Sequence, residues 1–195
     1  RSHIDGSPHR FTPERVIEIE HAIGADIIMP LDECIPYPAT REYTERSCEM
    51  TVRWADRSRE AHEREGGAAT LFAICQGSVY QDLREHCAGR LVAMDFPGYA
   101  IGGLAVGEPK DEMFDMVALS TAVLPEGKPR YLMGVGFPDD LIEGVSRGVD
   151  MFDCVMPTRN ARNGTVFTWD GRVVLKNAHQ ARRFEPIDPS CECPA

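Results

Sequence analysis

The stretch RYLMGVGFPDDLIEGVSRGVDMFDCVMP, residues 130–157, contains the pattern that decides the fold. Its apolar runs at 130–136 and 151–157 flank a segment at 139–147 that predicts a short helix. Neither run alternates with polar residues, which is typical of parallel strands covered on both faces. The stretch therefore predicts a strand, a helix and a second strand parallel to the first.

The same alternation extends towards the amino terminus. Thr12, Pro13 and Glu14 form a helix start, and Gly24 ends that helix. Further strands are expected at 25–33, 70–77 and 99–107, and further helices at 44–65, 79–93 and 111–122. Strand followed by helix, repeated along the chain, predicts an α/β fold with right-handed crossovers.

Two architectures fit this order, an open doubly wound sheet and a (β/α)8 TIM barrel. Polar residues and glycines fall at or near the carboxyl ends of the expected strands: Asp32, Gln76, Gly103, Gly134 and Asp153. A barrel collects functional groups from several strand ends, whereas an open sheet gathers them at one switch point. The sequence therefore favours the barrel, with about five strands in this chain and roughly three more expected before Arg1.

The region after residue 157 has a different character. Two apolar runs flank Asp170–Gly171, which predicts a β-hairpin. Residues 155–183 hold six basic side chains and one acidic side chain, although the whole chain has a net charge of −10. The acidic balance argues against a general nucleic-acid binder. The basic segment on charge alone fits a solvated face and a binding patch equally well.

Composition places the chain among packed cytoplasmic proteins. Apolar residues make up 43% of its 195 residues, and no apolar run approaches the roughly 18–20 residues of a membrane span. No secretory leader is visible. Of seven cysteines, Cys34, Cys75 and Cys154 lie in or beside apolar runs and are expected to be reduced core thiols.

The groups at the strand ends can recognise a purine edge. A carboxylate at Asp32 accepts two donors, while the amide of Gln76 and a bare backbone N–H at Gly103 suit a carbonyl. This set complements N1–H, the exocyclic amine and O6 of guanine, although other cyclic amides would also fit. Asp153 could be a metal ligand, a base or a nucleophile at a sugar carbon. Metal is disfavoured, because no His or second acid lies at a neighbouring strand end.

Long motifs connect these residues to a known family. The chain closely resembles bacterial queuine tRNA-ribosyltransferases, the tRNA-guanine transglycosylases, over nearly its whole length. The motifs that carry the resemblance are DIIMPLDECIPYPA, AICQGSVYQDLR, YAIGGLAVGE, the run from Lys128 to Gly164, and DPSCEC.

The resemblance implies a (β/α)8 barrel with a zinc-binding subdomain, usually in a homodimer. It implies a pentosyltransferase of queuosine biosynthesis. The enzyme exchanges guanine at the wobble position of tRNAs with GUN anticodons for 7-aminomethyl-7-deazaguanine, through a covalent aspartyl–ribose intermediate.

Site residues follow from the resemblance by position. Asp153 corresponds to the nucleophile, Asp32, Gln76 and Gly103 to the base-binding groups, and Leu104 to the main chain that meets the aminomethyl group. Two RNA-contacting segments are implied: Gly134, Val135, Gly136, Phe137, Pro138, Asp139 and Asp140, and Thr158, Arg159, Asn160, Ala161 and Arg162.

Two family features are not matched. The family's second aspartate, the general acid/base, belongs to an amino-terminal DSGGFQ-type segment, and its zinc site has the pattern CxCxxC with a later histidine. Cys191 and Cys193 match the first two zinc ligands. The expected organisation is a partial barrel at 1–157, a basic RNA-contacting loop and hairpin at 158–183, and the start of a zinc motif at 184–195. The chain alone is expected to be inactive.

Two other functions are less consistent with the sequence. A non-catalytic tRNA-binding or partner subunit of the same superfamily has no reason to retain Asp153 together with Asp32 and Gln76. An unrelated barrel hydrolase would need metal ligands at the strand ends, and the sequence places none there.

Overall fold

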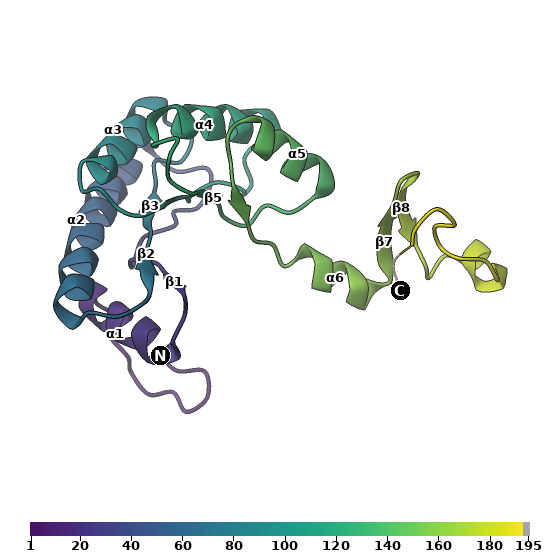
Figure 1. Ribbon diagram of the computed structural model, residues 1–195, viewed down its shortest axis with the longest axis horizontal. Helices are drawn as coiled ribbons and strands as arrows, with labels where there is room; N and C mark the ends of the chain where they lie inside the picture. Colours follow the sequence, from purple (N-terminus) through teal and green to yellow (C-terminus); the bar gives the residue numbers. More distant parts are fainter. Residues whose placement is uncertain (193–195) are drawn as a thin grey trace. The chain divides into compact units, whose positions relative to one another are not determined.

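The structure, a computed structural model, describes residues 1–192 and forms two compact units, Arg1–Asp153 and the residues from Cys154 onward (Figure 1). In the first unit helices and strands alternate, in the order α1 Pro13–Ile23, β1 Ile27–Ile28, α2 Arg41–Glu65, β2 Thr70–Leu71, β3 Ala73–Cys75, α3 Gln81–Val92, β4 Tyr99–Ile101, α4 Lys110–Val123, β5 Arg130–Leu132, α5 Pro138–Ser146 and β6 Met151–Phe152. Figure 1 shows α2 to α5 as an arc outside the strands of this unit. Among residues 1–192, no helix has both the length and the apolar character needed to cross a membrane.

The strands of the first unit pair in parallel, as the apolar runs predict. β1 pairs with β2, and a separate four-stranded sheet has the order β3-β4-β5-β6. Strands β3 and β4 are wholly buried, whereas in β5 only Leu132 is buried. Ala73, Ala100, Ile101 and Leu132 are inaccessible to solvent. The α/β class with a parallel sheet is therefore confirmed, and closure into a barrel stays a prediction.

The strands are shorter than the apolar runs that predict them. The run at 99–107, for example, is paired only over Tyr99–Ile101. Two residues after the ends of β3, β4 and β5 the chain turns at a glycine with positive φ, namely Gly77, Gly103 and Gly134. The backbone leaves the sheet at these points, so the polar strand-end residues lie in loops rather than in strands.

The helix signals are confirmed, and the largest difference in a boundary is at the start of α2. The Thr12 hydroxyl accepts a hydrogen bond from the Arg15 N–H over 3.2 Å, and Gly24 closes α1 in the left-handed conformation. Helix α2 begins at Arg41 rather than at residue 44, because the Thr40 side chain caps it by accepting from the Tyr43 N–H.

The cysteine prediction is correct in part. Cys75 is fully buried, together with Cys48 and Cys87 on the neighbouring helices α2 and α3. Cys34, however, is exposed, and Cys154 is half-buried. Cys34 lies in the loop after β1, in which the neighbouring Ile35 is buried and Cys34 is not.

The second unit contains α6 Met156–Asn163, the hairpin β7 Thr165–Thr168 and β8 Gly171–Val174, and a 3-10 turn at Ala178–Arg182. The predicted hairpin is confirmed, although its turn residues are Trp169 and Asp170, one position earlier than expected. Residues 158–162, predicted to form a loop, lie in α6 instead. A proline in the first turn and a left-handed cap at Gly164 favour this helix.

Candidate active site at the strand ends

A carboxylate and an amide from two different loops form a hydrogen-bonded pair in the site. Asp32 lies in the loop after β1, and Gln76 directly follows β3. The Gln76 Nε2 donates to Asp32 Oδ2 over 2.6 Å, and the Gln76 residue is only 2% exposed. Burial raises the pKa of the Asp32 carboxyl, and the hydrogen bond from Gln76 opposes that rise.

The other end of the Gln76 amide has unused hydrogen-bonding capacity. Its Oε1 is buried and has no hydrogen-bond partner within residues 1–192. A buried amide oxygen is normally paired, because the loss of its interaction with water is unfavourable. The Gln76 amide therefore keeps hydrogen-bonding capacity that the described residues do not use.

Gly103 approaches the same amide from the loop after β4. Its φ is +65°, and a Cβ added at this position would lie 2.1 Å from Gln76 Oε1. Only glycine can bring its backbone this close to Gln76. The next residue, Leu104, is 5% exposed, with its side chain among the buried apolar residues.

Asp153 is held differently, one residue past β6. Its Oδ1 accepts from the Tyr131 hydroxyl over 2.7 Å and from the Gly134 N–H over 2.8 Å. Asp153 itself is exposed. Because both hydrogen bonds go to Oδ1, Oδ2 is the oxygen that is available to a substrate. Burial and the neighbouring carboxylate raise the pKa of Tyr131, so its hydroxyl keeps the proton that it donates.

Strand order brings these groups to one edge of the sheet. Parallel strands have their carboxyl ends on the same side, so the sheet order β3-β4-β5-β6 places Gln76, Gly103, Gly134 and Asp153 along one edge in chain order. Asp32 joins this edge through its hydrogen bond to Gln76. The juxtaposition expected from the strand ends is thus present for Asp32, Gln76 and Gly103.

Comparison with known proteins assigns the chain to a family. The sequence model of the family described as queuine tRNA-ribosyltransferase matches residues 1–195. The chain belongs to the queuine tRNA-ribosyltransferase family.

Curated relatives of the same name are closely similar. Identity is 63% over 193 residues with the protein of Thermoanaerobacter sp. (strain X514), 61% with that of Desulforamulus reducens and 58% with that of Geobacillus thermodenitrificans. Each alignment covers 99% of this chain and 50–52% of the relative. The chain thus spans about half the length of these members of the queuine tRNA-ribosyltransferase family.

The first segment that the family resemblance assigns to RNA, 134–140, comprises the loop after β5 and the first three residues of α5. Phe137 is 46% exposed and precedes Pro138 at the helix start. Asp140, in contrast, is 6% exposed, and its carboxylate accepts from Lys110 Nζ over 2.6 Å. The geometry gives Asp140 a role in joining α4 to α5, which the sequence did not indicate.

The second segment, Thr158–Arg162, lies in α6 of the other unit. Arg159 and Arg162 are exposed and three residues apart, so they share one side of the helix. The half-buried Asn160 contacts Met156 through its amide. Two cations on one exposed helical side can contact neighbouring phosphates.

The zinc ligands can be placed only in part. Cys191 is exposed, and Cys193 lies outside the described residues. Within residues 1–192, no group of three or more His, Cys, Asp or Glu side chains is arranged to hold a metal ion. A structural zinc site needs four ligands, so these residues by themselves do not fit one.

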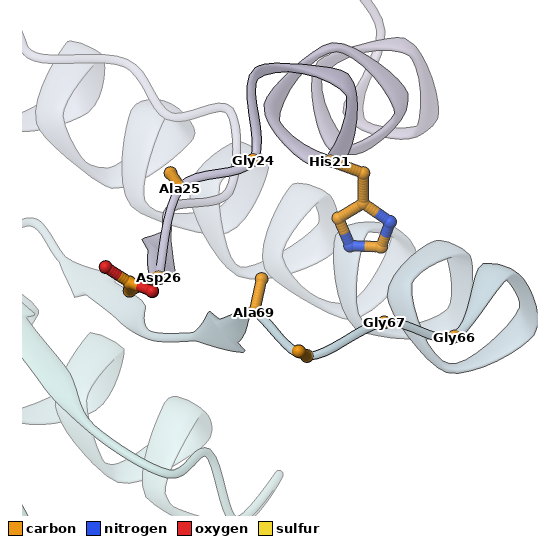
Figure 2. A pocket seen from close by; sticks show the side chains of 8 residues that line it. His21, Gly24, Ala25, Asp26, Gly66, Gly67 and Ala69 are labelled. Atoms are coloured by element: carbon orange, nitrogen blue, oxygen red, sulfur yellow. The ribbon is translucent and has the colours of Figure 1, made fainter.

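A separate hollow lies at the carboxyl-terminal ends of α1 and α2. It has a volume of about 260 Å³ and is lined by His21, Asp26 and the small residues around Gly24 and Gly66. Figure 2 shows the His21 ring between the end of α1 and the turn at Gly66–Gly67. None of the predicted site residues lines this hollow.

Proposed function

We propose that this chain carries the base-binding and nucleophilic parts of a tRNA-guanine transglycosylase. The enzyme, a pentosyltransferase of queuosine biosynthesis, exchanges guanine at the wobble position of GUN tRNAs for 7-aminomethyl-7-deazaguanine. The observation that carries the proposal is the Asp32–Gln76–Gly103 cluster on the sheet edge that ends at Asp153.

The cluster has the hydrogen-bonding groups that a guanine edge requires. Asp32 accepts from N1–H and the exocyclic amine, while the Gln76 amide and the Gly103 N–H face O6. In the structure Asp32 instead accepts from Gln76, so guanine must replace this hydrogen bond when it enters. The main chain at Leu104 then meets the aminomethyl group of the incoming base.

Asp153 supplies the nucleophile. Its Oδ2 forms a bond to C1′ of the ribose, the C1′–N9 bond breaks, and guanine leaves with the electron pair and takes up a proton from the solvent. The resulting ester is attacked by N9 of the incoming base, which loses its proton and restores the carboxylate. Tyr131 and the Gly134 N–H hold Oδ1 and thereby direct Oδ2.

RNA binding comes from the two assigned segments. The nucleotide must leave its stack to reach a strand-end pocket, so cations are needed at the flanking phosphates. In the second unit, Arg159 and Arg162 on α6 offer two cations to RNA phosphates, and in the first unit the segment 134–140 offers backbone and aromatic contacts. The acidic remainder of the chain limits non-specific binding to RNA.

Several features of the family remain proposals for this chain: barrel closure, a homodimer, cytoplasmic location, and structural zinc held by Cys191 and Cys193 with further ligands. Lack of turnover by these 195 residues alone is also a prediction. Exchange of labelled guanine into tRNA by the purified chain would contradict it.

The test of the proposed function is capture of the covalent intermediate. The chain is mixed with an anticodon stem-loop that contains a GUN anticodon and analysed on a denaturing gel. We expect an RNA-shifted band with the wild-type chain and none with Asp153→Asn. A shifted band that survives in Asp153→Asn would reject Asp153 as nucleophile. Stem-loop binding without any band would support a non-catalytic subunit.

A further inference from the structure

A buried arginine lies beneath the proposed base pocket. Arg84 of α3 is 0% exposed, and its guanidinium makes four hydrogen bonds to main-chain carbonyl oxygens. Nε and Nη2 donate to Ser78 O over 3.0 and 2.8 Å, while Nη1 and Nη2 each donate to Gly102 O over 3.2 Å. The planar guanidinium thus bridges two loops with a fixed geometry.

The two carbonyls belong to the loops that carry the base-binding groups. Ser78 is two residues after Gln76, and Gly102 immediately precedes Gly103. Packing around the bridge is tight, because a Cβ at Gly77 would lie 2.7 Å from the Arg84 Cα. A Cβ at Gly103 would lie 3.8 Å from Arg84 Nη2. The cation is therefore close to the part of the pocket that faces O6 of guanine.

Packing alone does not explain why a charged side chain is fully buried at Arg84. Removing a guanidinium from water is strongly unfavourable, and apolar residues of similar volume often replace buried charges without loss of stability. The Gly102 carbonyl and the Gly103 N–H belong to one conjugated peptide group. Charged hydrogen bonds to the carbonyl polarise that group and strengthen its N–H as a donor.

We propose that Arg84 is a positioning residue that fixes the Gln76 and Gly103 loops and strengthens the Gly103 N–H as a donor to O6 of guanine. This role rests on the proposed function of the pocket. The hydrogen bonds from Arg84 also favour departure of guanine. Negative charge develops at O6 as the C1′–N9 bond breaks, and the strengthened Gly103 N–H and the nearby cation stabilise that charge.

The test compares guanine with 6-thioguanine, whose sulfur is a weaker acceptor but whose N1–H and amine are unchanged. Dissociation constants for both bases are measured with the wild-type chain and with Arg84→Lys, which keeps the charge but cannot bridge two carbonyls in the same way. We expect about a tenfold loss of guanine affinity and a much smaller loss for 6-thioguanine, so the ratio of the two constants moves towards one.

Two controls separate this role from general support of the fold. Arg90→Met removes an exposed arginine from the same helix and should leave both dissociation constants unchanged. Urea unfolding of Arg84→Lys shows whether the variant is folded, and Arg84→Met is studied in the same way. Equal losses for guanine and 6-thioguanine in folded Arg84→Lys would overturn the proposal, and so would no loss for either. A wild-type chain that binds neither base would reject the base pocket itself, and with it the role of Arg84.

Discussion

Asp32 and Asp153 lie at two ends of one row of strand-end groups, and their surroundings differ. Asp32 is half-buried, hydrogen-bonded to a side-chain amide, and has a raised pKa. Asp153 is exposed and held at one oxygen by a tyrosine and a main-chain N–H. The difference teaches that burial suits a carboxylate to recognition, whereas exposure with one oxygen free suits it to attack.

The sharpest test of this contrast is Asp153→Asn. We expect the covalent adduct to become undetectable, because a neutral amide is a poor nucleophile, while guanine affinity changes less than about twofold. Denaturing gels and equilibrium binding of guanine measure the two effects. Asp111→Asn, an exposed acid at the start of α4, serves as the matched control and should form normal adduct. A large loss of guanine binding in Asp153→Asn would remove the distinction between the two carboxylates.

The buried side of the comparison is tested by Gly103→Ala. The new methyl group would overlap Gln76 Oε1, so we expect guanine affinity to fall by about a hundredfold and the free energy of unfolding to fall by roughly 2–4 kcal/mol. Gly24→Ala has a similar φ of +77° and nothing within 4 Å, so it should show backbone strain alone, about 1 kcal/mol. Equal destabilisation in the two variants would mean that the contact with Gln76 is unimportant.

Asp32→Asn separates recognition from stability. Loss of the charged acceptor should weaken guanine binding by about ten- to a hundredfold. The raised pKa means that folded Asp32 binds its proton more tightly than the unfolded chain does. As the pH rises from 3.8 through the raised pKa of folded Asp32, the free energy of unfolding of the wild type therefore falls relative to that of Asp32→Asn. The difference persists at higher pH.

Urea unfolding of the two proteins over a pH series measures that difference, and guanine binding should weaken as pH falls through the same range. A stability difference that does not change with pH would show that Asp32 ionises alike in the folded and unfolded chain.

The smallest effect is expected for Tyr131→Phe. Removal of one of the two donors to Asp153 should slow formation of the adduct about tenfold, because the carboxylate loses part of its orientation. Guanine affinity should stay unchanged, since Tyr131 lies on the Asp153 side of the comparison. The rate is followed by quenched time points on denaturing gels, and a loss of guanine affinity without a change in rate would contradict the assignment.

Much of the fold could be predicted from local patterns. Apolar runs without alternation indicated parallel strands, and Thr12 and Gly24 marked both ends of α1. Strand lengths and the helix at Met156–Asn163 were missed. An apolar run indicates burial but does not show which of its residues pair with a neighbouring strand. The polar sequence TRNAR gives a helix only weak local support, and the proline in the first turn and the left-handed cap at Gly164 favour this helix.

By itself the sequence determined the α/β order, the strand ends that carry polar groups, and the residue types that suit a guanine edge and a nucleophile. Only the tertiary structure decided how those groups are held. Gln76 reaches Asp32 across 44 residues, Tyr131 reaches Asp153 across 22, and Arg84 reaches Gly102 across 18. The physical reason is that short-range patterns specify burial and turns, whereas these hydrogen bonds exist only after parallel pairing has set distant loops side by side.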